Sequence, residues 1–99
     1  MNKINTIEGD VIARDMRVTI VAARFNELIV ESLIKGAIHC LRQHGAMDSA
    51  IEIIRVPGAY EMPLAVEKIA AARRADGIIA IGAVIRGGTP HFEYIAAET

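Results

Sequence analysis

The sequence predicts an α/β protein built on a doubly wound parallel sheet. Three short runs of β-branched and small apolar residues alternate with segments that have the period of an amphipathic helix, which gives the order β-α-β-α-β-α. Parallel strands need crossover connections, and these place helices against the sheet. If the second and third strands flank the first, the two full helices cover opposite faces, and a ligand site lies at the carboxyl ends of the strands.

The predicted strands are Val18 to Phe25, Ile51 to Val56 and Ile78 to Ile85. The first and third of these runs are so continuously apolar that they indicate strands buried on both faces of the sheet. We also expect an extra strand within Ile4 to Ile12, paired either with an edge of this sheet or with a neighbouring chain.

The first helix is predicted over Glu27 to His44, where apolar residues recur at spacings of three and four. Asn26 is the predicted N-cap, because its side chain can accept a hydrogen bond from the first turn. Gly45 is the predicted residue just past the helix, where a left-handed backbone ends it.

The second helix is predicted over Glu61 to Arg74, and Pro63 is tolerated because it falls in the first turn. A third helix is predicted to start at Thr89 and Pro90, where threonine caps the helix and proline takes its first position. No stop signal precedes Thr99, so we expect a single domain over residues 1–99 that is truncated at its C-terminus.

Length and composition limit the class of protein. The 99 residues amount to one small domain, and 53% hydrophobic against 23% charged residues is the balance of a soluble globular protein. A formal net charge of −1 gives no basic field for nucleic acid or an anionic membrane. The lone Cys40 argues against a disulfide framework and a zinc cluster, and no apolar stretch approaches the roughly 20 residues that span a bilayer. We therefore expect a cytoplasmic protein with no metal and no nucleic-acid or membrane partner.

The unusual residues gather in the three connections that leave the carboxyl ends of the predicted strands. These connections run over Arg24 to Asn26, Pro57 to Glu61 and Arg86 to His91. Parallel geometry brings all three to the same rim of the sheet, whereas the connections at the other end carry ordinary turn residues. A ligand site at this rim is therefore predicted.

A glycine pair leads directly into the third predicted helix. In Gly87-Gly88-Thr89, the glycines permit a close backbone approach and the helix start offers N–H groups, which favours phosphate or another anion. The alternatives are a mobile hinge or a positive backbone φ at the glycines. The spacing from Gly82 to Thr89 is similar to a nucleotide P-loop, but Gly88 stands where that motif has lysine, which argues against an NTPase.

Several side chains at this rim have two interpretations. His91 either accepts a proton beside the anion loop or is a helix-surface histidine without a task. Phe25 follows a strand end, where it either stacks on a flat heterocycle or packs against the start of the first helix. Tyr60 has similar alternatives, Glu61 also suits a helix start, and Arg86 either faces the anion or pairs within the chain.

Three motifs stand in order along the chain: RFN at 24–26, VPGAYEMP at 56–63 and IGAVIRGGTPHFEY at 81–94. Together they resemble the 6,7-dimethyl-8-ribityllumazine synthase family over nearly the whole chain. The resemblance implies a flavodoxin-like three-layer α/β/α fold, with a fourth strand expected beyond residue 99. It also implies a transferase at the penultimate step of riboflavin biosynthesis, which condenses 5-amino-6-(D-ribitylamino)uracil with 3,4-dihydroxy-2-butanone 4-phosphate. Phosphate and water are released, without metal or organic cofactor.

The same resemblance implies a role for each matching position. His91 is similar to the family's proton-transfer residue, and Phe25 is similar to the aromatic residue that stacks on the pyrimidine ring. The other matches are Ala59, Tyr60 and Glu61 for the ribityl chain, Ala83, Val84 and Ile85 for the uracil edge, and Gly88 and Thr89 for the phosphate.

The resemblance also implies self-association. Members of the family form pentamers, some of which assemble into larger cages, and a neighbouring subunit completes each site with residues beyond the segment matched here. We expect assembly of the same kind for this protein. The alternatives are a non-catalytic relative that binds a heterocycle or forms a shell, and an inactive fragment.

Overall fold

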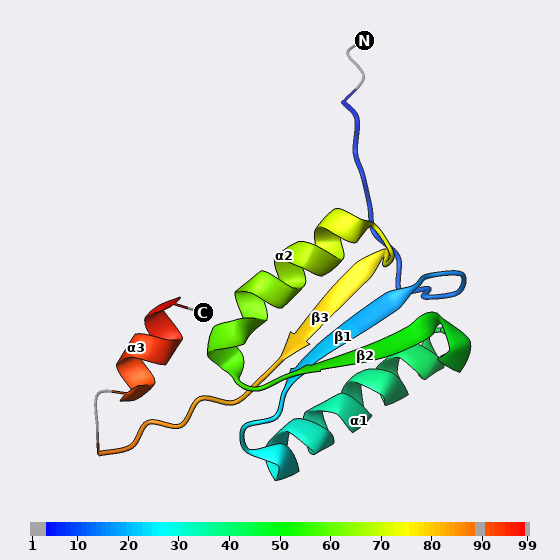
Figure 1. Ribbon diagram of the computed structural model, residues 1–99. Helices are drawn as coiled ribbons and strands as arrows, with labels where there is room; N and C mark the ends of the chain where they lie inside the picture. The colour runs from blue at the N-terminus through cyan, green and yellow to red at the C-terminus, as the bar shows by residue number, and fades with distance from the viewer. Residues whose placement is uncertain (1–3, 89–90, 99) are drawn as a thin grey trace.

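The computed structural model describes residues 4–88 and 91–98 and shows a three-stranded parallel sheet between two helices (Figure 1). The strands are β1 (Val18–Ala23), β2 (Ile51–Val56) and β3 (Gly77–Ile81), and the helices are α1 (Glu27–Gln43), α2 (Met62–Ala72) and α3 (His91–Glu98). Two short 3-10 turns, η1 (Asp48–Ala50) and η2 (Ala59–Glu61), precede β2 and α2. The predicted α/β class is confirmed.

β1 lies in the middle of the sheet, in the strand order β2-β1-β3. Val18 pairs with Ile51 on one side and with Gly77 on the other, and both pairings are parallel. All six residues of β1 are buried, because this strand has a neighbour on each edge and a helix on each face. The prediction that the second and third strands flank the first is confirmed.

Alternation of side chains along β1 divides the core into two layers. On one face of the sheet, Ile20 packs with Val30 and Ile34 of α1. On the other face, Val21 packs with Met62 of α2. Full burial of an aliphatic side chain contributes roughly 1.5–3 kcal/mol, so these layers hold β1 between the two helices. The two helices therefore cover opposite faces of the sheet (Figure 1).

α1 begins and ends through its backbone conformation. Asn26 occupies the N-cap position with φ 60 and ψ 58, and its side chain makes no capping hydrogen bond. The predicted N-cap position is therefore confirmed, but the side-chain hydrogen bond of an ordinary cap is absent, because that bond belongs to an extended N-cap backbone that Asn26 does not have. At the other end, Gly45 has φ +100 and the Ala46 N–H donates to Leu41 O at 2.9 Å, which is the predicted glycine ending.

Two predicted strands end earlier than the sequence indicated. β1 stops at Ala23, before Phe25, and β3 stops at Ile81. A strand lasts only while a neighbour offers hydrogen bonds, and Ile81 is the last residue of β3 that pairs with β1. Residues 82–88 run on without a partner strand in the described part of the chain, and Ile85 is exposed rather than buried on both faces.

The second predicted helix is shorter at both ends. Instead of Glu61 to Arg74, the structure has α2 from Met62 to Ala72, with η2 in front of it. Pro63 lies in the first turn, as predicted. Arg73 takes a left-handed backbone with φ 55 and ψ 33 at the C-cap, and this conformation ends the helix.

The segment before β1 forms no strand within residues 4–12. These residues are exposed and lead away from the sheet (Figure 1), so the predicted pairing of Ile4 to Ile12 with this sheet is wrong. The Asp10 carboxylate accepts a hydrogen bond from the Ile12 N–H at 3.1 Å, which turns the chain, and the Ala13 N–H then donates to His44 O at 2.7 Å. Pairing with a neighbouring chain stays a prediction.

α3 follows the extended segment and lies off the end of the sheet, beside the start of α2 (Figure 1). It contacts η2, the turn that precedes α2. The predicted helix start at Thr89 and Pro90 lies outside the described residues. None of the helices within 4–88 and 91–98 has the length and apolar character needed to cross a membrane.

Candidate functional site

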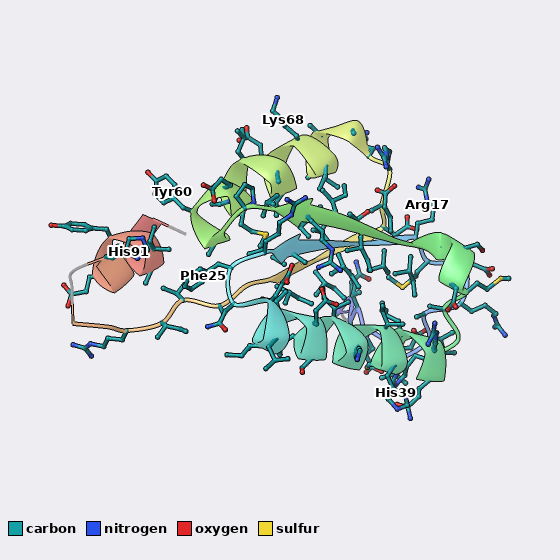
Figure 2. All side chains as sticks on the ribbon, turned by 60° about the horizontal axis from the view of Figure 1, so that its bottom comes forward. Arg17, Phe25, His39, Tyr60, Lys68 and His91 are labelled. Carbon is teal, nitrogen blue, oxygen red and sulfur yellow. The ribbon has the colours of Figure 1, made fainter. Side chains whose placement is uncertain are left out.

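A pocket of about 260 Å³ lies at the carboxyl ends of the strands. It is formed by the connection from β1 to α1, the connection from β2 to α2, the segment after β3, and α3. Figure 2 shows Phe25, Tyr60 and His91 at this end of the molecule and Arg17 at the other. The lining residues are Phe25, Pro57, Gly58, Ala59, Tyr60, Glu61, Ala83, Val84, Ile85, His91 and Ile95.

The first wall of the pocket is the short link between β1 and α1. Arg24 is still held to the sheet, because its N–H donates to Val56 O at 2.8 Å. Phe25 follows with 52% of its surface exposed, although large aromatic side chains beside a buried strand ordinarily pack inside. Its side chain lines the pocket, so an aromatic ring is available to stack on a planar group.

The second wall is the η2 turn between β2 and α2. The Glu61 N–H donates to Gly58 O at 3.3 Å and closes the turn, while Ala59 is buried. A Cβ at Gly58 would stand 3.2 Å from Glu61 Oε2, so glycine leaves the space that this carboxylate needs. Tyr60 is exposed and also lines the pocket. The turn thus brings one carboxylate and one phenol to the site.

The third wall is the extended segment that continues from β3. Ala83, Val84 and Ile85 all line the pocket. Because no strand pairs with residues 83–85 in the described part of the chain, their backbone N–H and C=O groups are not used in a sheet. A row of backbone donors and acceptors of this kind suits the edge of a planar heterocycle that has its own donors and acceptors.

α3 contributes a histidine and an aliphatic side chain. His91 and Ile95 are four residues apart, so they lie on one face of the helix, and both line the pocket. The contact between α3 and η2 keeps this helix near the second wall. Ile95 is absent from the predicted site residues, although its spacing from His91 indicates it. Pro57 and Gly58 are the other lining residues for which the sequence indicated no role.

The structure gathers most of the residues that the family resemblance points to. Phe25, the stretch 59–61, the stretch 83–85 and His91 come from separate parts of the sequence, and all of them line the same pocket. Their roles stay predictions, because placement in a pocket does not by itself identify a ligand.

The predicted anion loop is only partly described. Gly88 lies before α3 and does not line the pocket, and Thr89 lies outside the described residues. A Cβ at Gly87 or Gly88 would meet no atom of the described residues within 4 Å, and neither glycine has a positive φ. A positive φ, one of the two alternatives for these glycines, is therefore wrong.

The charged pairs with shifted pKa values lie away from the pocket, near the amino ends of the strands. The pKa of Asp76 is lowered chiefly because its carboxylate accepts the Arg17 N–H at 2.8 Å. The pKa of Asp48 is lowered chiefly by its hydrogen bond with the Arg42 guanidinium. These exposed pairs join the ends of elements and contribute little each. The described residues contain no group of three His, Cys, Asp or Glu side chains that could hold a metal ion.

The pocket combines an aromatic ring, an unpaired stretch of backbone, a carboxylate and an imidazole. A ring and an open backbone suit a planar polar heterocycle, and a carboxylate accepts hydrogen bonds from hydroxyl groups. An imidazole accepts a proton at one nitrogen and donates one from the other. The arrangement therefore suits acid–base chemistry on a heterocycle that carries hydroxyl groups.

Comparison with known proteins gives one consistent family. A family model described as 6,7-dimethyl-8-ribityllumazine synthase matches residues 15–99. A curated protein of that name from Halorhodospira halophila is 58% identical over 92 residues, which are 92% of this chain and 59% of that protein. Another of the same name from Desulfovibrio desulfuricans is 49% identical over 98 residues, which are 99% of this chain and 63% of that protein. The chain thus spans about three fifths of the length of these relatives.

Proposed function

The chain belongs to the 6,7-dimethyl-8-ribityllumazine synthase family, and on this premise we propose that its pocket forms 6,7-dimethyl-8-ribityllumazine. The substrates are 5-amino-6-(D-ribitylamino)uracil and 3,4-dihydroxy-2-butanone 4-phosphate, and phosphate and water are released. One observation carries the proposal: residues from four separate parts of the chain, each within a family-like motif, line one cavity.

The uracil ring is assigned to the first and third walls of the pocket. Phe25 stacks on the face of the ring, and the backbone of residues 83–85 pairs with its edge. In support, Phe25 is half exposed where it lines the pocket, and residues 83–85 have no partner strand within the described residues. Stacking of a base on an aromatic side chain contributes roughly 1–3 kcal/mol in comparable sites.

The ribityl chain is assigned to η2. Its hydroxyl groups need hydrogen-bond acceptors, and the Glu61 carboxylate beside Gly58 supplies one. Hydrogen bonds to a charged group contribute about 1.5–3 kcal/mol each, so one well-placed carboxylate fixes the polyol chain. Ala59 and Tyr60 form the surface along which the rest of the chain lies.

The phosphate group of the second substrate is assigned to Gly88 and Thr89, which precede α3. The first N–H groups of a helix favour an anion. In support, no atom of the described residues beyond its chain neighbours lies within 4 Å of a Cβ position at Gly88, so these residues leave the backbone open to a ligand. His91 follows Thr89 by two positions in the sequence, and it also lines the pocket assigned to the pyrimidine.

His91 moves protons during the condensation. The amine of the pyrimidine substrate attacks the ketone of the second substrate, water leaves, and phosphate is eliminated. Each of these steps adds a proton to an oxygen or removes one from a nitrogen or carbon. A positioned imidazole contributes about 10²–10⁴-fold to such a rate. Holding the two substrates in register supplies much of the remaining acceleration.

Self-association into pentamers or larger assemblies is the second part of the proposal. In support, β2 and β3 are the edges of the sheet in the described part of the chain, and large apolar side chains stay exposed. Strand edges offer unpaired backbone groups to other chains, and exposed apolar patches mark contact surfaces. The exposed residues include Leu28, Ile29 and Leu33 on α1 and Ile4, Ile7 and Val11 before β1.

A turnover assay on the natural full-length protein tests the proposed reaction. Both substrates are supplied, and the absorbance of the lumazine is followed beside the release of inorganic phosphate. We expect equal amounts of the two products. If the pyrimidine substrate binds and neither product forms, the protein is a heterocycle-binding relative without catalysis. If the pyrimidine does not bind, the assignment of the pocket is wrong.

A further inference from the structure

Asn26, the residue after Phe25, has a left-handed backbone with φ 60 and ψ 58. Among the described residues, the other positive φ values at residues with a side chain belong to Asp15 and Arg73. Asp15 precedes β1 and Arg73 follows α2, so both lie near the amino ends of the strands. Asn26 alone of the three adjoins a residue that lines the pocket.

Helix capping does not explain this conformation. The Asn26 side chain makes no capping hydrogen bond. Its carbonyl oxygen accepts the N–H groups of Ile29 and Val30, each at 3.1 Å, and the carbonyl of any residue can do this. What asparagine adds is tolerance of the left-handed region, which it enters more readily than other residues with a side chain.

Both neighbours of Phe25 are fixed to the fold. On one side, the Arg24 N–H donates to Val56 O at 2.8 Å and stays with the sheet. On the other side, Asn26 anchors the first turn of α1 through its carbonyl oxygen. Phe25 is therefore a link of one residue between two fixed points. The path of this link, and with it the direction of the ring, depends on the backbone turn at Asn26.

We propose that Asn26 is a positioning residue whose left-handed backbone aims the Phe25 ring at the pyrimidine of the substrate. The inference rests on the proposed function for the identity of that ligand. Asn26 acts through Phe25 and needs no contact of its own with the substrate. A substitution that disfavours the left-handed region therefore weakens pyrimidine binding, whereas glycine, which enters that region freely, preserves it.

The experiment compares Asn26→Ala with Asn26→Gly in the natural full-length protein. Both variants lack the amide group, and they differ in how readily they adopt a positive φ. We measure kcat, the KM of each substrate, and the affinity of the ribitylaminouracil alone. Asn26→Ala should raise the KM of the pyrimidine roughly fivefold to thirtyfold, the range to which the penalty on the left-handed region converts. The KM of the butanone phosphate and kcat should change little, and Asn26→Gly should resemble the parent.

Arg73→Ala is the matched control. Arg73 also has a left-handed backbone, but it lies at the exposed end of α2 away from the pocket. This variant should lower the melting temperature about as Asn26→Ala does, while both KM values stay at those of the parent. A purely structural effect of backbone strain would instead change the two variants alike.

Three further results would overturn the inference. Equal rises in the pyrimidine KM for Asn26→Ala and Asn26→Gly would show that the amide group, and not the backbone, is what matters. An unchanged KM in Asn26→Ala would show that the ring keeps its place without the left-handed residue. A parent protein that does not bind the pyrimidine removes both the inference and the proposed function. A parent that binds the pyrimidine without turnover fails only the proposed function, because the affinities still compare the variants.

Discussion

His91 is the first residue of α3, one helical turn before Ile95, and both side chains line the pocket. We expect His91→Ala to lower kcat by about 10²–10⁴-fold, because the proton transfers lose their acid–base group. The affinity for the pyrimidine substrate should change much less, since the walls assigned to that ring stay intact. His39→Ala on the exposed surface of α1 is the control, and it should leave kcat unchanged. A His91→Ala variant with the kcat of the parent would remove His91 from the mechanism.

Phe25 is the residue assigned to recognition of the pyrimidine. We expect Phe25→Ala to weaken binding of the ribitylaminouracil by about 1–3 kcal/mol, which is the range for a base stacked on an aromatic side chain. Phe25→Tyr keeps the ring and should keep most of the affinity. Calorimetric titration measures both variants. An unchanged affinity in Phe25→Ala, together with a loss of thermal stability, would support packing against the start of α1 instead.

The sequence predicts which residues lie at the rim of the sheet, because each of them follows a run of apolar residues. Their roles could not be predicted, since the pattern around Phe25 and His91 suited a structural task as well as a ligand. Ile95 was not predicted as a site residue: its spacing from His91 puts both on one face of α3, but that this face turns to the pocket depends on how α3 packs against η2. The left-handed backbone of Asn26 was not predicted either, because asparagine before a helix ordinarily indicates a side-chain cap.

At the scale of elements, the alternation of strands and helices could be predicted and some of the boundaries could not. The bounds of β2 agree with the sequence pattern, Ile51–Val56. The apolar run of the third strand continues to Ile85, but pairing with β1 ends at Ile81. An apolar side chain indicates that a residue is suited to burial. The end of a strand depends instead on where backbone pairing with the neighbouring strand stops.

Two glycines, one inside α1 and one just past its end, should change stability in opposite directions when replaced by alanine. Gly36 is exposed inside the helix, and a Cβ there would meet nothing within 4 Å. Gly45 ends the helix with φ +100, and a Cβ there would stand 3.4 Å from Arg14 Cβ. We expect Gly36→Ala to raise the free energy of unfolding by roughly 0.5–1 kcal/mol and Gly45→Ala to lower it by about 1–2 kcal/mol. Urea unfolding measures both, and changes of the same sign would contradict the assigned end of α1.

At the scale of the whole molecule, the doubly wound order followed from the sequence because β-α-β units leave few arrangements of a parallel sheet. The same pattern predicts that this order leaves apolar surface open, with the third strand as an edge of the sheet. Only β1 is fully buried, and both of its neighbours are edge strands in the described part of the chain.

We therefore expect the 99-residue chain to self-associate in solution. Two edge strands and exposed aliphatic side chains such as Leu28 and Ile7 favour contacts with other chains. Sedimentation velocity at several concentrations measures the size distribution. A monodisperse monomer that unfolds cooperatively would contradict this expectation.

The structure of the protein with a ribitylaminouracil analogue that lacks the reactive amine tests the pocket assignment most directly. We expect the pyrimidine ring to stack on Phe25, its edge to pair with the backbone of residues 83–85, and the ribityl chain to lie along η2 with a hydroxyl group on the Glu61 carboxylate. An analogue bound at another place, or bound in this pocket with Phe25 turned away from its ring, would contradict the assignment.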